Sequence, residues 1–284
     1  MTVPQAIALG VVEGITEYLP VSSTGHLLLA QRGLGLGMRS EEEKTAAHAF
    51  AVCIQFGAIL AVLGLYRRRV WDMLRGVVGK DVAGRRLAWH VVLGVCPAIV
   101  AGLLLEKPIK RYLFGGGELG LWPVVAAWIV GGLAILVVSR WRGPSRLVPE
   151  QGRDLSQLTW RRALFVGSVQ CLALWPGVSR SLATIVGGSL AGLRLPAAVE
   201  FSFLLGLVTL GGATVKDAWE YGPLMVDLYG LPPLLAGTAA AAVAAAAAVT
   251  WMVGYLSRHG MQLFGYYRLA IGTLVAVLLL LDVL

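Results

Sequence analysis

The chain has 284 residues, of which 57% are hydrophobic and only 14% are charged. This composition excludes an ordinary soluble domain and predicts a polytopic membrane protein. The net charge of +8 does not indicate nucleic-acid binding, because most basic residues fall in short segments between apolar runs. The three cysteines lie in apolar stretches without metal-ligand spacing, which argues against a disulfide framework.

Apolar runs follow one another along the chain in a regular order. The first, 3–31, is broken by Pro20, so that neither half can cross a bilayer core of about 30 Å. Three runs long enough to cross follow, then a second broken run, 163–193, which Pro176 and Gly177 interrupt, and then three more long runs. The six predicted spans are 47–66, 86–106, 119–141, 198–219, 231–256 and 261–284.

The two broken runs predict re-entrant helical hairpins, because irregular backbone at membrane depth is tolerated only where protein or a wet cavity surrounds it. The predicted fold is therefore an all-α polytopic membrane protein with six transmembrane helices and two re-entrant hairpins in an inverted-topology repeat. The repeat halves are about 1–145 and 155–284 of a single membrane domain. Three crossings per half make the hairpins enter from opposite faces, so we expect their tips to meet near the midplane.

Basic residues predict the orientation. Of the 24 Lys and Arg residues, fifteen fall on one predicted side and seven on the other, while Arg180 and Arg268 lie inside apolar segments. The richer side should be cytoplasmic, which places both termini and the mouth of the first hairpin outside. The small residues of the run Ala239–Ala248 predict close helix packing.

The first hairpin carries two carboxylates, Glu13 and Glu17, which share one helix face at a spacing of four residues. Ionisable groups inside a membrane are costly and usually functional. Two carboxylates in a poorly solvated site repel, so either one is protonated or a cation such as Mg²⁺ lies beside them. The alternative is a structural pair that bonds to neighbouring helices.

Hydroxyl groups follow the break at Pro20. Ser22, Ser23 and Thr24 begin the returning half-helix, whose N-terminus can cap with a hydroxyl or bind an anion. Ser23 lies one turn before His26, so it could act as a nucleophile with the imidazole as base. The alternatives are plain N-capping for the hydroxyls and a buried structural role for His26.

The second hairpin repeats this pattern. Gly177 allows a tight turn, Ser179 and Ser181 offer caps and donors, and Arg180 has no acidic neighbour in its own segment. A guanidinium binds phosphate oxygens bidentately, although a structural salt bridge to Glu13 or Glu17 is the alternative. Carboxylates, hydroxyls, an imidazole and an arginine together are the equipment of phosphoryl transfer. Since no soluble domain is expected, the substrate should be a phosphate or pyrophosphate carried on a lipid.

These segments resemble the undecaprenyl-pyrophosphate phosphatase family of the bacitracin-resistance type. The family has an E-x-x-x-E segment running into P-V-S-S-T-G-H and a later P-G-x-S-R-S-x-x-T; here these are Glu13–His26 and Pro176–Thr184. The stretches 50–62 and 200–205 are also similar, whereas Ala51 and Val208 depart from the expected acidic residue and proline.

The resemblance implies a bacterial plasma-membrane enzyme that removes the terminal phosphate of a C55 polyprenyl pyrophosphate, using Mg²⁺ or Ca²⁺, and so recycles the cell-wall lipid carrier. It implies Glu13 and Glu17 as the acidic, metal-holding pair, Ser23 as nucleophile, His26 in proton transfer and Arg180 on the pyrophosphate. Further substrate-binding positions are Ser22, Thr24, Gly25, Gln55, Gly177, Ser179, Ser181 and Thr184. The nucleophile stays open between Ser23 and a water activated by His26, and the assembly between monomer and homodimer.

A transporter is the alternative function. Paired broken helices that meet at the midplane also occur in secondary transporters, so the chain could flip a polyprenyl phosphate lipid. A transporter needs no nucleophile, which makes Ser23 the residue that distinguishes the two functions.

Overall fold

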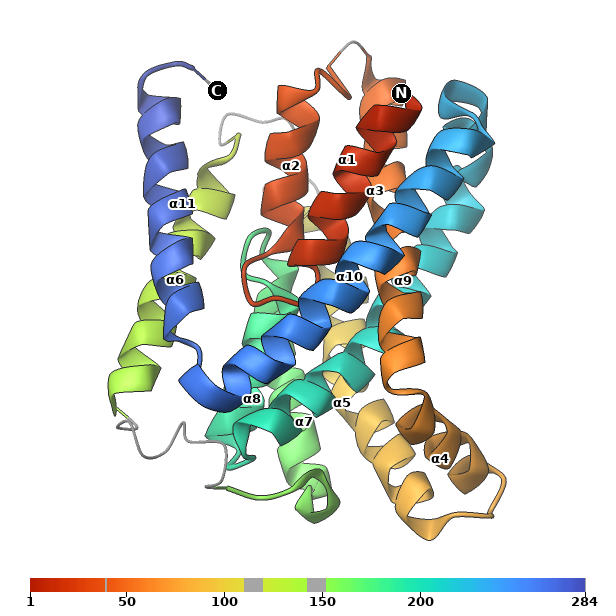
Figure 1. Ribbon diagram of the computed structural model, residues 1–284, viewed down its shortest axis with the longest axis vertical. Coiled ribbons are helices and arrows are strands. Elements are labelled where there is room, and N and C mark those ends of the chain that lie inside the picture. The colour runs from red at the N-terminus through yellow and green to blue at the C-terminus, as the bar shows by residue number, and fades with distance from the viewer. Residues whose placement is uncertain (39, 110–119, 142–151, 284) are drawn as a thin grey trace. The chain divides into compact units, whose positions relative to one another are not determined.

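The computed structural model describes residues 1–38, 40–109, 120–141 and 152–283 (Figure 1). Within these ranges it contains eleven α-helices, two short 3₁₀ helices and no strand. The elements are α1 Val3–Thr16, α2 Ser23–Gly33, α3 Glu41–Leu65, α4 Arg67–Val77, α5 Val82–Ile109, α6 Trp122–Trp141, η2 Leu155–Gln157, α7 Trp160–Gln170, η3 Cys171–Leu174, α8 Arg180–Leu190, α9 Leu195–Tyr229, α10 Leu231–His259 and α11 Gln262–Leu280.

Six helices, α3, α5, α6, α9, α10 and α11, are long and apolar enough to cross a membrane. The prediction of an all-α membrane protein with six spans is therefore confirmed. Residues 119 and 284, at the ends of two predicted spans, lie outside the described residues.

The start of α3 and the end of α9 differ most from the predicted spans. Helix α3 begins at Glu41, because the Ser40 hydroxyl accepts a hydrogen bond from the Glu43 backbone N–H and acidic residues favour a helix N-terminus. Helix α9 runs on to Tyr229, through the charged residues near 216–220 and through Pro223, whereas the predicted span ended at 219. Charge marks where an apolar run ends, but it does not by itself end a helix.

Helix α4 is a further difference, since its residues were expected to form part of a basic loop. Helix α4 packs closely on the start of α5, and the contact is made at Gly76. A Cβ on Gly76 would lie 2.7 Å from the Cα of Arg85, closer than real side chains approach. Four of the basic residues between the first two spans, Arg67, Arg68, Arg69 and Arg75, are therefore carried on a helix.

The chain forms two compact units, and each is described by itself. The first comprises residues 1–19, 23–67 and 206–251, and the second comprises 20–22, 68–205 and 252–284. Each unit takes segments from both predicted repeat halves. The division into halves near 145–155 stays a prediction, and residues 142–151 lie outside the described ranges.

In the first unit, α1 exposes a row of β-branched apolar side chains. Val3, Ile7, Val11 and Ile15 recur every four residues and are all exposed, whereas Glu13 on the opposite face is wholly buried. This helix therefore exposes a row of apolar side chains and buries a carboxylate, which is the opposite of what a helix on a soluble protein does with these residue types. This pattern supports a lipid environment around α1.

Small residues let α1 and α3 approach α10 in the same unit. A Cβ on Gly14 would lie 2.8 Å from the backbone nitrogen of Ala245, and one on Gly57 would lie 2.9 Å from that of Ala242. These contacts fall on the alanine run of α10, so the prediction that this run permits close helix packing is confirmed.

Gly57→Ala is expected to destabilise the protein, because the added methyl group meets the α10 backbone and overpacking typically costs about 1–3 kcal/mol. Gly64→Ala is the matched control, since it lies on the same helix and a Cβ there meets nothing within 4 Å. Thermal unfolding in detergent measures the difference. Equal melting temperatures for the two variants would contradict the packing.

In the second unit, α6 and α11 lie side by side, and α7 packs on both α5 and α8 (Figure 1). The contact of α7 with α5 is made at Gly167 and Gly94, where a Cβ on Gly167 would lie 2.9 Å from the carbonyl carbon of Gly94. Helices α5 and α6 thus support the second broken segment, to which α7 and α8 belong.

Candidate functional site

The first broken segment is a pair of packed helices, α1 and α2, joined by residues 17–22. The Glu17 backbone N–H still donates to the Glu13 carbonyl at 2.9 Å, so one helical turn connects the two carboxylates before the chain turns. With 14 and 11 residues, the helices are about 21 and 16 Å long and neither reaches across a bilayer core. The break at Pro20 is confirmed, while re-entry into a membrane stays a prediction.

Ser23 is joined directly to one of the carboxylates. Its Oγ donates to Oε2 of Glu17 at 2.5 Å, and both residues are buried. Hydrogen bonds from a hydroxyl to a charged carboxylate are short and strong. Ser23 is also the first residue of α2, at the positive end of that helix. The structure thus pairs the predicted nucleophile with Glu17, which is a candidate base beside His26.

The second broken segment consists of α7, the 3₁₀ helix η3, a turn at 175–179, and α8. Ser179 caps α8, and its Oγ accepts from the Leu182 backbone N–H at 3.2 Å. The Trp175 indole donates to the carbonyl of Pro123 at 2.9 Å and anchors the turn on α6. The predicted break at Pro176 and Gly177 is confirmed.

The two turns share an unusual backbone conformation. Ser22 has φ of 76° and Ser179 has φ of 72°, and each immediately precedes a returning helix. Left-handed backbone is strained for a residue with a side chain, and such strain gathers at functional sites. Ser23 and Arg180 therefore occupy equivalent positions, each the first residue of its helix, as an internal duplication would place them.

Arg180 is held by the start of α9. Its Nη1 donates to the carbonyl of Ser202 at 2.9 Å, and the Ser202 hydroxyl lies 2.6 Å from Oγ1 of Thr184. Ser179 and Ser181 are also joined, with 2.9 Å between their Oγ atoms. Ser202 was not predicted as a site residue. The only sequence signal for it was the similarity of the stretch 200–205 to the family.

The structure does not bring every predicted position into these networks. Thr24 and Gly25 lie on α2 and Gln55 lies half-buried on α3. Among the described residues, no side-chain hydrogen bond joins them to Ser23 or Glu17. Glu13, Glu17, Ser23 and His26 belong to the first unit and Arg180 to the second. Their meeting in one pocket stays a prediction.

The carboxylate pair suits a hard divalent cation. Glu13 and Glu17 are 0% and 6% exposed and lie one helical turn apart, Glu13 within α1 and Glu17 as its C-cap. Among the described residues no group of three or more His, Cys, Asp or Glu side chains is gathered. Mg²⁺ is commonly held by one or two carboxylates together with water and substrate phosphate oxygens, so Glu13 and Glu17 could hold such a cation.

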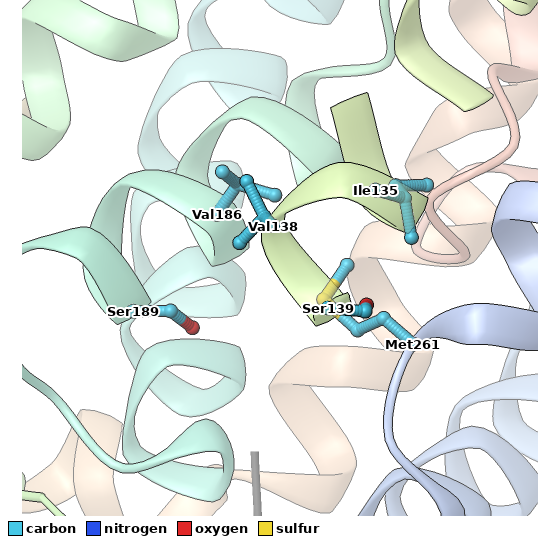
Figure 2. A pocket seen from close by; sticks show the side chains of 6 residues that line it. All are labelled: Ile135, Val138, Ser139, Val186, Ser189 and Met261. Carbon is cyan, nitrogen blue, oxygen red and sulfur yellow. The ribbon is translucent and has the colours of Figure 1, made fainter. Parts of the chain in front are cut away.

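A small cavity in the second unit is a poor candidate for the phosphate site. It is lined by Ile135, Val138, Ser139, Val186, Ser189 and Met261, without any charged side chain (Figure 2). Its volume of ≈ 10 Å³ leaves room for one water molecule at most.

This chain is similar to known proteins over almost its whole length. The family model described as bacitracin resistance protein BacA matches residues 6–274. An undecaprenyl-diphosphatase of Sorangium cellulosum is 46% identical over 272 residues, covering 95% of this chain and 84% of the relative. Undecaprenyl-diphosphatase 1 of Burkholderia thailandensis is 45% identical over 272 residues, covering 95% and 93%. Because the family model and both relatives match almost the whole chain, this protein belongs to the bacitracin resistance protein BacA family.

Proposed function

We propose that this protein hydrolyses undecaprenyl diphosphate to undecaprenyl phosphate and inorganic phosphate in a bacterial inner membrane. The hydrogen bond from the buried Ser23 hydroxyl to Glu17 is the observation on which the mechanism rests. The names of the relatives support the substrate, and the six apolar helices support a lipid-borne one.

In the first step, Ser23 Oγ attacks the terminal phosphorus while Glu17 accepts its proton. A bond forms between Oγ and phosphorus, and the bond from that phosphorus to the bridging oxygen breaks. Undecaprenyl phosphate leaves with the bridging oxygen and its electron pair. The 2.5 Å hydrogen bond places the base within reach of the proton before the substrate arrives.

In the second step, water attacks the phosphoserine, and inorganic phosphate leaves as the Ser23 hydroxyl forms again. His26, one turn after Ser23 on α2, is placed to take the proton from this water. Glu17 returns the proton it accepted to Oγ. His26 then passes the water proton to the departing phosphate or to solvent, so that Ser23, Glu17 and His26 all return to their starting protonation states.

Arg180, at the N-terminus of α8, would counter charge on the pyrophosphate. Ser179, Ser181 and Thr184 would orient phosphate oxygens near that arginine. Glu13 and Glu17 would hold a divalent cation, which when bound neutralises phosphate charge. The basic loops predict that the first hairpin opens to the outer face, with both termini outside.

Purified protein in detergent is expected to release phosphate from undecaprenyl diphosphate, and chelation of divalent cations should reduce the release to background. Added Mg²⁺ or Ca²⁺ should restore it, because the buried carboxylate pair needs a counter-charge to accommodate the pyrophosphate. Phosphate release is measured directly. Undecaprenyl phosphate as substrate is the control, since it lacks the anhydride.

Wild-type protein that releases no phosphate, yet moves undecaprenyl phosphate across proteoliposomes, would contradict the proposal in favour of a transporter. In that case Ser23→Ala would leave the lipid movement unchanged, because transport needs no nucleophile.

A further inference from the structure

Arg268 is a buried cation that the proposed mechanism does not use. It lies within the membrane-spanning helix α11, and its side chain is wholly buried. Its Nη2 donates to the carbonyls of Ala127, at 2.7 Å, and Gly177, at 2.9 Å, while Nη1 donates to the carbonyl of Pro20 at 3.3 Å. Among the described residues, its polar partners are therefore backbone carbonyls.

Two of these carbonyls lie at the two breaks. Pro20 is in the turn of the first hairpin and Gly177 is in the turn of the second. A break in a helix leaves carbonyls without an intrahelical donor, and in a membrane water is not at hand to replace it. One guanidinium, with five donors in a rigid plane, can satisfy carbonyls from both turns at once.

Helix α6 completes the support for these turns. The Trp128 indole donates to the carbonyl of Val21 at 2.8 Å, and Trp128 itself is wholly buried. Gly131, one turn further along α6, leaves room for the guanidinium. A Cβ at that position would lie 2.9 Å from Cζ of Arg268. The position of the Arg268 guanidinium is therefore set by α6 as well as by α11, the helix that carries it.

We propose that Arg268 is a positioning residue that holds the turns of both hairpins, and so sets the places of Ser23 and Arg180 for catalysis. Ser23 follows Pro20 by three residues, and Arg180 follows Gly177 by three residues. A displaced turn moves the first residue of the helix behind it. The kinetic test of this inference rests on the proposed function, because it measures phosphate release. The structural test rests only on the hydrogen bonds of Arg268 to the two turns.

Arg268→Lys tests the geometry while it keeps the charge. A lysine ammonium is a compact point donor and cannot reproduce the planar contacts to three separate carbonyls. We expect kcat for phosphate release to fall about 100-fold with KM changed less than threefold, because a misplacement of about 1 Å can have such an effect. Arg140→Lys is the control, since Arg140 is exposed at the end of α6.

Gly131→Ala tests the same contact without altering the arginine. The added methyl group should push the guanidinium off its carbonyls and lower kcat in the same direction. Gly254→Ala is its control, because a Cβ there meets nothing within 4 Å. If both changes act through the same hydrogen bonds, the double variant should be less impaired than the product of the single effects.

Hydrogen–deuterium exchange gives a readout that does not depend on activity. Amides of 17–25 and 175–182 should exchange at least tenfold faster in Arg268→Lys, whereas those of α4 should be unchanged. The exchange rates are compared only for folded protein, which is separated from aggregate by gel filtration. If the wild-type protein releases no phosphate, the proposed function is contradicted but the inference about Arg268 is not. The exchange rates of the two turns would still test that inference.

The proposal is overturned by wild-type kcat and wild-type exchange in Arg268→Lys. If that variant does not fold, Gly131→Ala decides. Normal kcat in folded Gly131→Ala, or complete failure of that variant to fold, would leave Arg268 with a role in stability alone.

Discussion

Ser23→Ala is expected to lower kcat for phosphate release on the order of 10⁴- to 10⁶-fold, the range seen when a catalytic nucleophile is removed. The substitution removes only the side-chain hydroxyl of Ser23. It donates to Glu17 at 2.5 Å, so the substitution also leaves that carboxylate without its hydroxyl donor. Steady-state kinetics on purified protein in detergent measure the effect, and KM should change far less than kcat.

Ser257→Ala is the matched control for this experiment. The Ser257 hydroxyl donates to the Val253 carbonyl within its own helix, α10, and should be dispensable. Acid quenching of wild-type protein during turnover should trap phosphate on the peptide that contains Ser23. Substantial activity in Ser23→Ala would show that water attacks the substrate directly, with His26 as base.

The sequence was sufficient to predict the helical framework. Proline and glycine in the middle of apolar runs marked both breaks, and the six long runs marked the spans. These features are local, because chain reversal and span length are decided within about thirty residues. Helix α4 was not predicted, because its many charged residues resemble those of a loop. Its packing on α5 through Gly76 is a contact between two elements and not a local feature.

Partners distant in sequence could not be predicted. Arg268 binds the carbonyl of Pro20, 248 residues away, and no pattern in a single sequence relates the two. The pairing of Ser23 with Glu17 was also missed, although both residues were predicted to act. Helical spacing favours His26 as the neighbour of Ser23, but the turn at Pro20 folds the end of α1 back towards the start of α2.

The left-handed serines show a further limit. Glycine is the residue expected where φ is positive, so the sequence offered Gly177 as the strained position of the second turn. In the structure φ is positive at Gly177 and also at Ser179. It is positive too at Ser22, the corresponding residue of the first turn. Both serines carry a side chain despite the strain, as expected if their hydroxyls have a function there.

Arg180→Lys is expected to lower kcat/KM about 10²- to 10³-fold, comparable with the loss of one preorganised donor to a developing charge. The change keeps the positive charge but removes the planar fork that matches phosphate oxygens. It also removes the anchor on α9, because Nη1 of Arg180 donates to the Ser202 carbonyl at 2.9 Å and so fixes the direction of the side chain.

Arg258→Lys is the control, since Arg258 is exposed in the last turn of α10. Arg180→Ala should be impaired further than Arg180→Lys, because it loses the charge as well as the geometry. Kinetics with undecaprenyl diphosphate at fixed ionic strength distinguish the two contributions. A kcat/KM within threefold of wild type in Arg180→Lys would mean that the side chain acts only as a charge, and the equivalence of Arg180 with Ser23 would then be architectural rather than catalytic.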